Sequence, residues 1–279
     1  MRKAFIWAPV VASLLVSACS IIPAVSERID TAKQLAAQAG FQQSVLSNAQ
    51  FDLAAFTKPA RQANPVLVIY IEGDGRAWKT ASLPSDNPTP TNPLALRLAI
   101  QDPRPAVAYL ARPCQFVALP SRGCSEKLWT SARFSPAVIE TMNEAIEKLK
   151  QQFGASQLVL IGYSGGGAVA ALVAAKRSDI KTIITVAGNL DTDAWVRLYG
   201  LEPLSESINP ASVAQSIRNI PQTHYVGAKD DVIPRSMSQS FLQKMGSPNQ
   251  AKVIELPNYG HVCCWTERWS ELLKDAAPN

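Results

Sequence analysis

The sequence predicts an α/β fold with a mostly parallel central sheet flanked by helices. Short apolar runs alternate with stretches of helical periodicity along most of the chain. One of these runs, residues 158–161, leads through a glycine-rich segment directly into a helix of small residues, 168–175. The length of 279 residues fits one such domain. Because parallel sheets bind ligands at the carboxyl ends of their strands, the residues that follow the strands are the candidates for function.

The N-terminal half contains the elements that lead up to the middle of the sheet. Residues 26–39 predict a polar-faced linker helix, because apolar and polar side chains alternate there at helical spacing. The other expected elements are short strands over 43–46 and 51–55, an apolar strand over 66–71, a Pro- and Asn-rich loop over 81–93, a short helix over 94–100 and a strand over 106–110.

The C-terminal half continues the alternation. Residues 136–153 carry apolar side chains at helical spacing and begin with Pro136, which is favoured at the first position of a helix. Further strands are expected over 157–161, 182–186, 223–226 and 252–256, with helices over 168–175, over 235–245 and from Thr266 onward.

The segment Gly162-Tyr163-Ser164-Gly165-Gly166 has the pattern G-x-S-x-G between a strand and a helix. In this pattern the glycines let the backbone turn sharply, so the serine hydroxyl stands clear of the sheet beside the helix N-terminus. A simple tight turn also fits the pattern, whereas a dinucleotide-binding loop would need glycine at position 164. Ser164 is therefore the candidate nucleophile.

Two later segments extend this pattern, and the three together resemble the α/β-hydrolase fold. Residues 228–234 follow an apolar strand and are similar to the acid loop of that fold, with Asp230 at the position of the acid. Residues 258–261 are similar to its Gly-His loop and end at His261. The resemblance implies a catalytic triad of Ser164, Asp230 and His261, in the chain order typical of the fold.

The chain offers one alternative to the acid and one to the base. Asp231 stands beside Asp230, and the loop register favours Asp230. The second histidine, His224, lies inside a strand pattern, whereas His261 follows one on a loop. A serine hydroxyl is a poor nucleophile until an imidazole accepts its proton, and a carboxylate fixes the tautomer of that imidazole.

The resemblance also implies an oxyanion hole made of backbone N–H groups. One is the amide of Gly165, directly after the nucleophile, and the other is the amide of Asp74, in the loop after an earlier strand. This loop departs from the pattern of the family, because Glu72 stands where histidine is frequent. An inward Asp74 carboxylate would oppose the oxyanion, so we expect it to turn away, towards Arg76 or Arg112.

Residues 188–210 correspond to the segment that commonly forms a cap in this fold. They are too few for a large lid domain, so a small cap or none is expected over an open pocket. Trp78, Trp129 and Trp195 are candidates for the lining of that pocket, although aromatic residues on such segments pack in cores at least as often.

The N-terminus resembles the signal peptide of bacterial lipoproteins. Two basic residues precede an apolar stretch over 4–16 that is too short to span a bilayer comfortably, and residues 16–19 are similar to a lipobox. The resemblance implies a signal peptide over 1–18, acylation of Cys19 with fatty acids such as palmitate, a linker over 19–40 and a hydrolase domain over 41–279. An ordinary secretory signal cut near the same place, with Cys19 an incidental residue, is the alternative. Ser20 after the cysteine favours the outer membrane, facing the periplasm.

Composition argues against several other classes. The net charge of +5 comes from scattered basic residues, so a nucleic-acid surface with a clustered basic patch is not expected. No second long apolar stretch follows residue 19, so we expect membrane attachment through the lipid alone. Triad chemistry needs neither a cofactor nor a metal, and none is expected.

Four cysteines follow Cys19, an even number that suggests disulfides in an oxidising compartment. Cys114 with Cys124 is the first choice, because this pair closes a short loop after a strand. Cys263 and Cys264 are adjacent, and a bridge between neighbours is uncommon, so crossed pairing to the 114–124 loop stays open.

These patterns favour a lipid-anchored serine hydrolase of the cell envelope. It would cleave an ester, a thioester or an amide of a small-molecule or lipid-like substrate through an acyl-enzyme. A serine peptidase on the same scaffold is one alternative. Another is a lipoprotein that binds an envelope ligand on this scaffold without catalysis, since fold alone does not fix function.

The lipobox generates a testable prediction. Replacing Cys19 with Ala should stop acylation and leave an unprocessed precursor, because the lipoprotein peptidase requires the modified cysteine. Mass spectrometry of the N-terminal peptide measures both effects. An unmodified N-terminus on the native protein would contradict the assignment.

Overall fold

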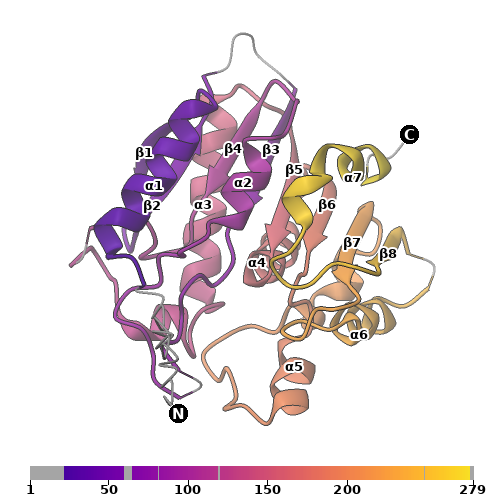
Figure 1. Cartoon of the computed structure of the whole chain (residues 1–279). Helices are drawn as coiled ribbons and strands as arrows, with labels where there is room; N and C mark the ends of the chain where they lie inside the picture. The colour runs from indigo at the N-terminus through magenta and orange to yellow at the C-terminus, as the bar shows by residue number, and fades with distance from the viewer. Residues whose placement is uncertain (1–21, 60–64, 81, 119, 248, 277–279) are drawn as a thin grey trace, which may run out of the picture.

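The computed structural model describes residues 22–59, 65–80, 82–118, 120–247 and 249–276. The expected signal peptide and Cys19 lie outside these residues. In the described part of the chain, eight strands form one sheet with the order β1-β2-β4-β3-β5-β6-β7-β8 (Figure 1). The strands β1, β2 and β4 pair antiparallel in that order, and every other neighbouring pair is parallel. This arrangement confirms the predicted fold class.

Most of the elements lie within a few residues of their expected bounds. The strands are β1 (Gln42–Ser47), β2 (Asp52–Thr57), β3 (Val66–Ile71), β4 (Val107–Leu110), β5 (Gln157–Tyr163), β6 (Ile180–Val186), β7 (Gln222–Gly227) and β8 (Ala251–Leu256). The α-helices are α1 (Val25–Gln38), α2 (Leu94–Ala99), α3 (Pro136–Gln152), α4 (Gly165–Ala174), α5 (Thr192–Tyr199), α6 (Arg235–Met245) and α7 (Trp269–Ala276). The helix α5 was not predicted, and the expected last helix is split by a short 3₁₀ turn over Trp265–Glu267.

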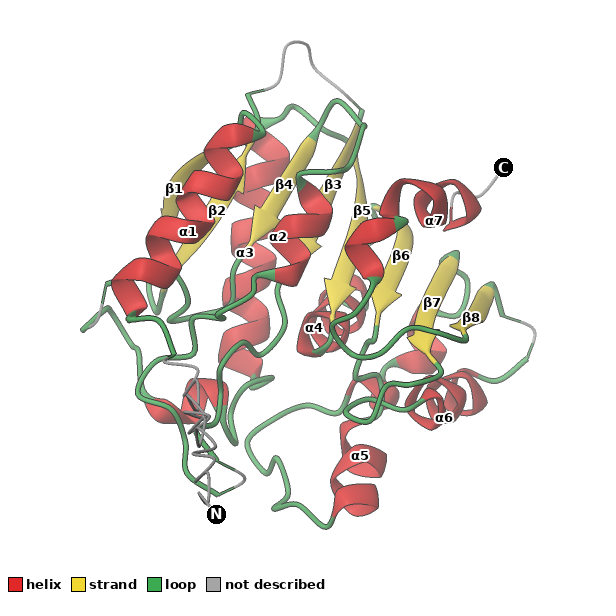
Figure 2. Ribbon diagram, viewed as in Figure 1, coloured by secondary structure: helices red, strands yellow, loops and turns green. Residues whose placement is uncertain are grey.

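The helices cover the sheet in two layers (Figure 2). One apolar core lies between the sheet and α3, α4 and α6, and the other lies between the sheet and α1, α2 and α7. Successive side chains of a strand point to opposite faces, so Leu67 and Ile69 of β3 enter the first core while Val68 and Tyr70 enter the second. Both faces of the central strands are therefore buried, as is usual for parallel sheets.

Helix α1 packs against the domain, which differs from its expected role as a linker. Ala32 and Ala36 stand one turn apart and are buried in the second core. The Arg28 guanidinium is also buried, and it donates a hydrogen bond to the carbonyl of Thr89. Two small side chains on one face let the helix approach the sheet closely. Residues 25–38 thus belong to the folded domain.

The carboxyl ends of four parallel strands carry the candidate site residues. The segment after β3 holds Glu72 and Asp74, and Ser164 follows β5. Asp230 and His261 lie on the loops after β7 and β8. Since these four strands are parallel within one sheet, their carboxyl ends meet at one edge.

The four cysteines in the described part of the chain form two disulfides. Cys114 pairs with Cys124, with their Cα atoms 5.6 Å apart, which is a common separation for a bridge. Cys263 pairs with its neighbour Cys264, so the structure has no crossed pairing between the two regions. Among the described helices, none combines the length and the apolar character that a membrane span requires.

Candidate active site

The nucleophile elbow holds Ser164 in a backbone conformation that non-glycine residues rarely adopt, with φ of 50° and ψ of −121°. The glycines around it allow helix α4 to approach the sheet. A Cβ atom on Gly162 would lie 2.2 Å from the carbonyl oxygen of Gly166, and one on Gly166 would lie 2.2 Å from that of Ile71. No side chain fits at either position, so the pattern of the sequence is a steric requirement.

Backbone hydrogen bonds fix the elbow against the neighbouring strand β6. The Ser164 N–H donates to the carbonyl of Val186, at 2.9 Å. The Ser164 carbonyl accepts from the N–H of Asn189, at 3.1 Å, and from that of Gly167, at 3.0 Å. The backbone on both sides of the nucleophile is therefore held.

The three residues of the expected triad form one chain of hydrogen bonds. The Nε2 atom of His261 lies 3.1 Å from Oγ of Ser164, and its Nδ1 atom lies 3.0 Å from Oδ2 of Asp230. The other carboxylate oxygen of Asp230 accepts the N–H groups of Val232 and Ile233. A carboxylate only accepts, so Nδ1 carries the proton and Nε2 is free to accept the proton of the serine.

The two alternatives to these partners lie elsewhere. Asp231 is exposed, and its backbone carbonyl accepts a hydrogen bond from the hydroxyl of Tyr199. His224 is fully buried in β7, where its Nδ1 lies 2.9 Å from the hydroxyl of Thr185. Burial lowers the pKa of His224 to about 3, so its imidazole is neutral at physiological pH.

The loop that carries His261 is held by an indole that the sequence analysis did not single out. Trp265 is fully buried, and its Nε1–H lies 3.0 Å from the carbonyl oxygens of both Gly260 and His261. The Gly260 N–H donates to the carbonyl of Cys263 at 2.7 Å. The ring of Tyr163 lies against the imidazole, with 5.3 Å between the centroids. These contacts orient the imidazole of His261.

The two expected oxyanion donors are available at the site. Within the described residues, neither the N–H of Asp74 nor that of Gly165 has a hydrogen-bond partner. The loop of Asp74 lies beside the elbow, because a Cβ atom on Gly73 would lie 3.2 Å from Cβ of Ser164, and the Asp74 carboxylate lies against Gly165. The structure thus brings both donors next to Ser164.

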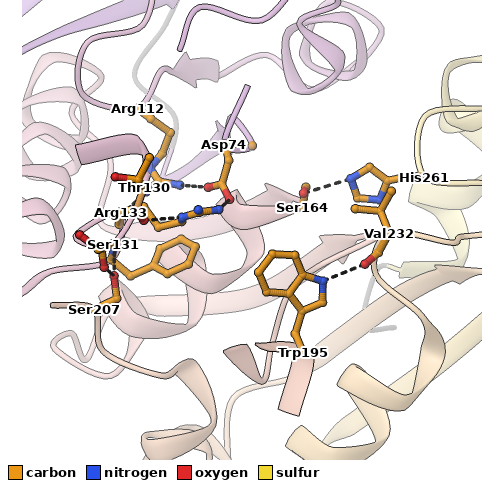
Figure 3. A network of polar contacts seen from close by, with 12 residues as sticks. Asp74, Arg112, Thr130, Ser131, Arg133, Ser164, Trp195, Ser207, Val232 and His261 are labelled. Atoms are coloured by element: carbon orange, nitrogen blue, oxygen red, sulfur yellow. Dashed lines mark hydrogen bonds and ion pairs between the residues drawn. The ribbon is translucent and has the colours of Figure 1, made fainter. Parts of the chain in front are cut away.

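Two buried arginines hold the Asp74 carboxylate (Figure 3). Arg112 lies 3.2 Å from Oδ1, and Arg133 lies 2.7 Å from Oδ2. The pairing with Arg112 was one of the two expected, whereas Arg76 makes no ion pair with Asp74. Arg133 was not predicted. It follows Asp74 by 59 positions, and nothing in the local sequence links them.

The arginine pair is itself anchored. Arg112 donates to the carbonyl of Arg133, and its guanidinium lies 5.1 Å from the ring centre of Phe134. Nε of Arg133 donates to the carbonyl of Thr130 at 2.7 Å. Burial lowers the pKa of Arg112, and the Asp74 carboxylate opposes this effect. The cluster is a fixed group of charges beside the nucleophile.

Glu72 is a buried carboxyl behind the oxyanion loop. One of its oxygens accepts the Gly73 N–H at 2.9 Å, and the other accepts the hydroxyl of Tyr109 at 3.1 Å. Burial raises the pKa of Glu72 from 4.5 to about 7, while these hydrogen bonds and the N–H groups of Ala95 and Leu96 act in the other direction. The residue at the usual histidine position thus holds the loop that carries Asp74.

A cavity of about 540 Å³ opens over Ser164. Trp78 and Trp195 line it, whereas Trp129 is buried and donates to the carbonyl of Ser85. Trp195 belongs to α5, which forms the small cap. Its Nε1–H donates to the carbonyl of Val232 at 2.9 Å, so the cap is bonded to the loop that carries Asp230.

One group of side chains in the described residues has the composition of a metal site. The sulfur atoms of Cys263 and Cys264 and the carboxylate of Glu267 lie within 4.8 Å of one another. The two sulfurs are bonded to each other, and a disulfide offers no thiolate ligand. In this state the group does not fit a metal.

Comparisons with known proteins agree on the fold. A family model described as alpha/beta hydrolase fold matches residues 119–204. No curated protein matches the chain. An esterase from Pyrococcus furiosus is 15% identical, with a TM-score of 0.60 over 86% of this chain and 93% of its own. The chain has the α/β-hydrolase fold.

Two further solved structures show the same likeness. An α/β serine hydrolase homologue from Coxiella burnetii is 16% identical, with a TM-score of 0.58 over 84% of this chain and 95% of its own. An acylaminoacyl peptidase from Pyrococcus horikoshii is 12% identical, with a TM-score of 0.60 over 84% of this chain but only 41% of its own. At these identities the likeness shows the α/β-hydrolase fold alone.

The geometry of the acid loop predicts different effects for its two aspartates. Asp230→Asn should lower the rate of acylation by about three to four orders of magnitude, because an amide no longer fixes the Nδ1–H tautomer of His261. Asp231→Asn should leave the rate almost unchanged and serves as the matched control. Pre-steady-state ester hydrolysis measures both. The reverse ranking would assign the acid to Asp231.

The buried Glu72 predicts a pH-dependent stability. Its folded pKa of about 7 exceeds the ordinary 4.5, so its contribution to stability is complete below pH 4.5 and is lost as the pH rises to 7. When the pH rises from about 5 to about 8, the unfolding free energy of the unmodified protein should fall by about 2 kcal/mol more than that of the Glu72→Gln variant. The variant serves as the reference because its amide has no proton to release. Urea unfolding at both pH values measures this difference, and an equal difference at both would contradict it.

Proposed function

We propose that this protein is a serine hydrolase that cleaves an ester bond through an acyl-enzyme, with Ser164, His261 and Asp230 as its triad. The observation that carries the proposal is the continuous hydrogen-bonded chain from the Ser164 hydroxyl through the imidazole to the buried Asp230 carboxylate. The two free N–H groups beside it, of Asp74 and Gly165, supply the oxyanion hole. The non-catalytic alternative gives no account of why all of these groups are aligned.

The chemistry follows from the positions of these groups. Oγ of Ser164 attacks the ester carbonyl carbon while Nε2 of His261 takes its proton, and the carbonyl oxygen becomes an oxyanion bound by the two N–H groups. The carbon–oxygen bond to the leaving alcohol then breaks, and the imidazolium returns the proton to that alcohol. Water, deprotonated by the same imidazole, attacks the acyl-enzyme and releases the acid and Ser164.

An ester is favoured over a peptide by the small cap. The Pyrococcus horikoshii acylaminoacyl peptidase has more than half of its length outside the part that this chain matches. The esterase from Pyrococcus furiosus is matched over nearly all of its length. The likeness to the esterase therefore spans nearly all of both chains, whereas the likeness to the peptidase spans less than half of the peptidase.

We place the enzyme in the bacterial cell envelope, anchored by a lipid on Cys19 in the outer membrane and facing the periplasm. The lipobox-like residues 16–19 support this location, and the two disulfides fit an oxidising compartment.

Labelling with a fluorophosphonate probe tests the proposal. Ser164→Ala should abolish both labelling and the hydrolysis of p-nitrophenyl acetate, because the nucleophile is lost, while the far-ultraviolet circular dichroism stays unchanged. Ser131→Ala is a matched control. This serine lies on a nearby loop, and its hydroxyl donates a hydrogen bond to the Glu206 carboxylate. Labelling that persists on another serine would overturn the assignment.

A further inference from the structure

A second cavity, of about 500 Å³, adjoins the one over Ser164. The two cavities share Trp78, Arg133 and Trp195 in their walls. The rest of the second wall includes Leu201 and Leu204, and its exposed surface is mostly apolar. The second cavity therefore borders the catalytic one, and its chemistry differs from that of the polar triad.

The triad determines which half of an ester faces this second cavity. The leaving alcohol must receive its proton from Nε2 of His261, so it lies on the histidine side of Ser164. The acyl group then lies on the opposite side. In Figure 3, Arg133 and Asp74 lie on one side of Ser164 and His261 lies on the other. Arg133 lines both cavities, whereas His261 lines only the first. The second cavity is thus on the acyl side.

The one cation shared by the two walls is already paired. Arg133 binds the Asp74 carboxylate and the carbonyl of Thr130, and its side chain is 6% exposed. Its charge is therefore committed to these partners, and its methylene groups add to the apolar wall. Glu202, at the exposed end of the cavity, further disfavours an anionic group.

We propose that this second cavity binds the acyl chain of the substrate, so that the enzyme prefers esters of medium-length fatty acids to acetyl esters. The inference rests on the proposed hydrolase function and specifies its substrate class. Each methylene that enters an apolar site improves binding by about fourfold, so kcat/KM should rise by that factor for each methylene until the cavity is filled.

The cap offers a matched pair of leucines for the test. Leu201 lines the second cavity and is 40% exposed. A larger side chain at this position can therefore occupy the cavity without disturbing the packing of a buried core. Gly200 ends α5 in the left-handed conformation, with φ of 61°, and turns the chain towards that position. Leu198 lies on α5, is 55% exposed and lines neither cavity.

The experiment uses the purified full-length protein in detergent and p-nitrophenyl acetate, butyrate, hexanoate and octanoate. For the unmodified protein, kcat/KM should increase along the series. Leu201→Trp should abolish that increase by filling the cavity, while its kcat/KM on acetate changes by less than about twofold, since acetate does not reach the cavity. Leu198→Trp should keep the full increase.

The outcomes separate the inference from the proposed function. An absence of turnover on every ester overturns both. Turnover of acetate without an increase for longer chains, or equal profiles for Leu201→Trp and Leu198→Trp, overturns the acyl cavity alone. Should Leu201→Trp lose acetate hydrolysis as well, Leu201→Asp against Leu198→Asp decides the question. A charge in the cavity should reduce octanoate hydrolysis at least tenfold relative to acetate, and an unchanged ratio overturns the inference.

Discussion

The close approach of helix α4 to the end of strand β3 is the constraint on which the catalytic geometry depends. The Ile71 carbonyl occupies the space that a Cβ atom on Gly166 would need, so the helix and the oxyanion loop are in contact. This contact requires a sharp turn between β5 and α4, and Ser164 adopts a positive φ there, a conformation that costs about 1–3 kcal/mol. Hydrogen bonds from the elbow to Val186 and Asn189 offset that strain. The nucleophile is thus presented before any substrate binds.

The close contact between α4 and the segment after β3 also accounts for the charged groups beside the proposed oxyanion hole. The proposed mechanism takes one N–H from Asp74, and the carboxylate of the same residue packs against Gly165. A lone carboxylate there would repel the developing oxyanion. Arg112 and Arg133 both contact it, and one negative charge between two positive charges leaves the cluster net positive. In the proposed mechanism this positive cluster would stabilise the oxyanion, so the two arginines offset the negative charge that Asp74 brings to the site.

Residues whose roles are local could be identified from the sequence, and residues whose roles depend on tertiary contacts could not. The bounds of β3 and α6 match their expected ranges, because an apolar run and a helical period are local signals. The elbow and the loops of Asp230 and His261 were found through patterns of a few residues. Arg133 acts on Asp74, which the fold brings to it from 59 positions away. Trp265 bonds carbonyls that are close in the chain, but its position depends on its burial in the second core, which no local pattern shows. Helix α1 has a polar composition typical of a linker, and only the contacts of Ala32 and Ala36 show that it packs on the sheet.

The small cap and the catalytic acid form one structural unit. Trp195 and Tyr199 of α5 donate hydrogen bonds to the backbone carbonyls of Val232 and Asp231, the two residues that follow Asp230. The N–H groups of Val232 and Ile233 in turn bind the Asp230 carboxylate. A displacement of α5 would therefore move the backbone of residues 231 and 232, and this backbone holds the Asp230 carboxylate. We therefore expect that substitutions at Leu201 can alter substrate preference only while Trp195 and Tyr199 keep these bonds. The two bonds hold the loop of Asp230, and Asp230 in turn holds His261.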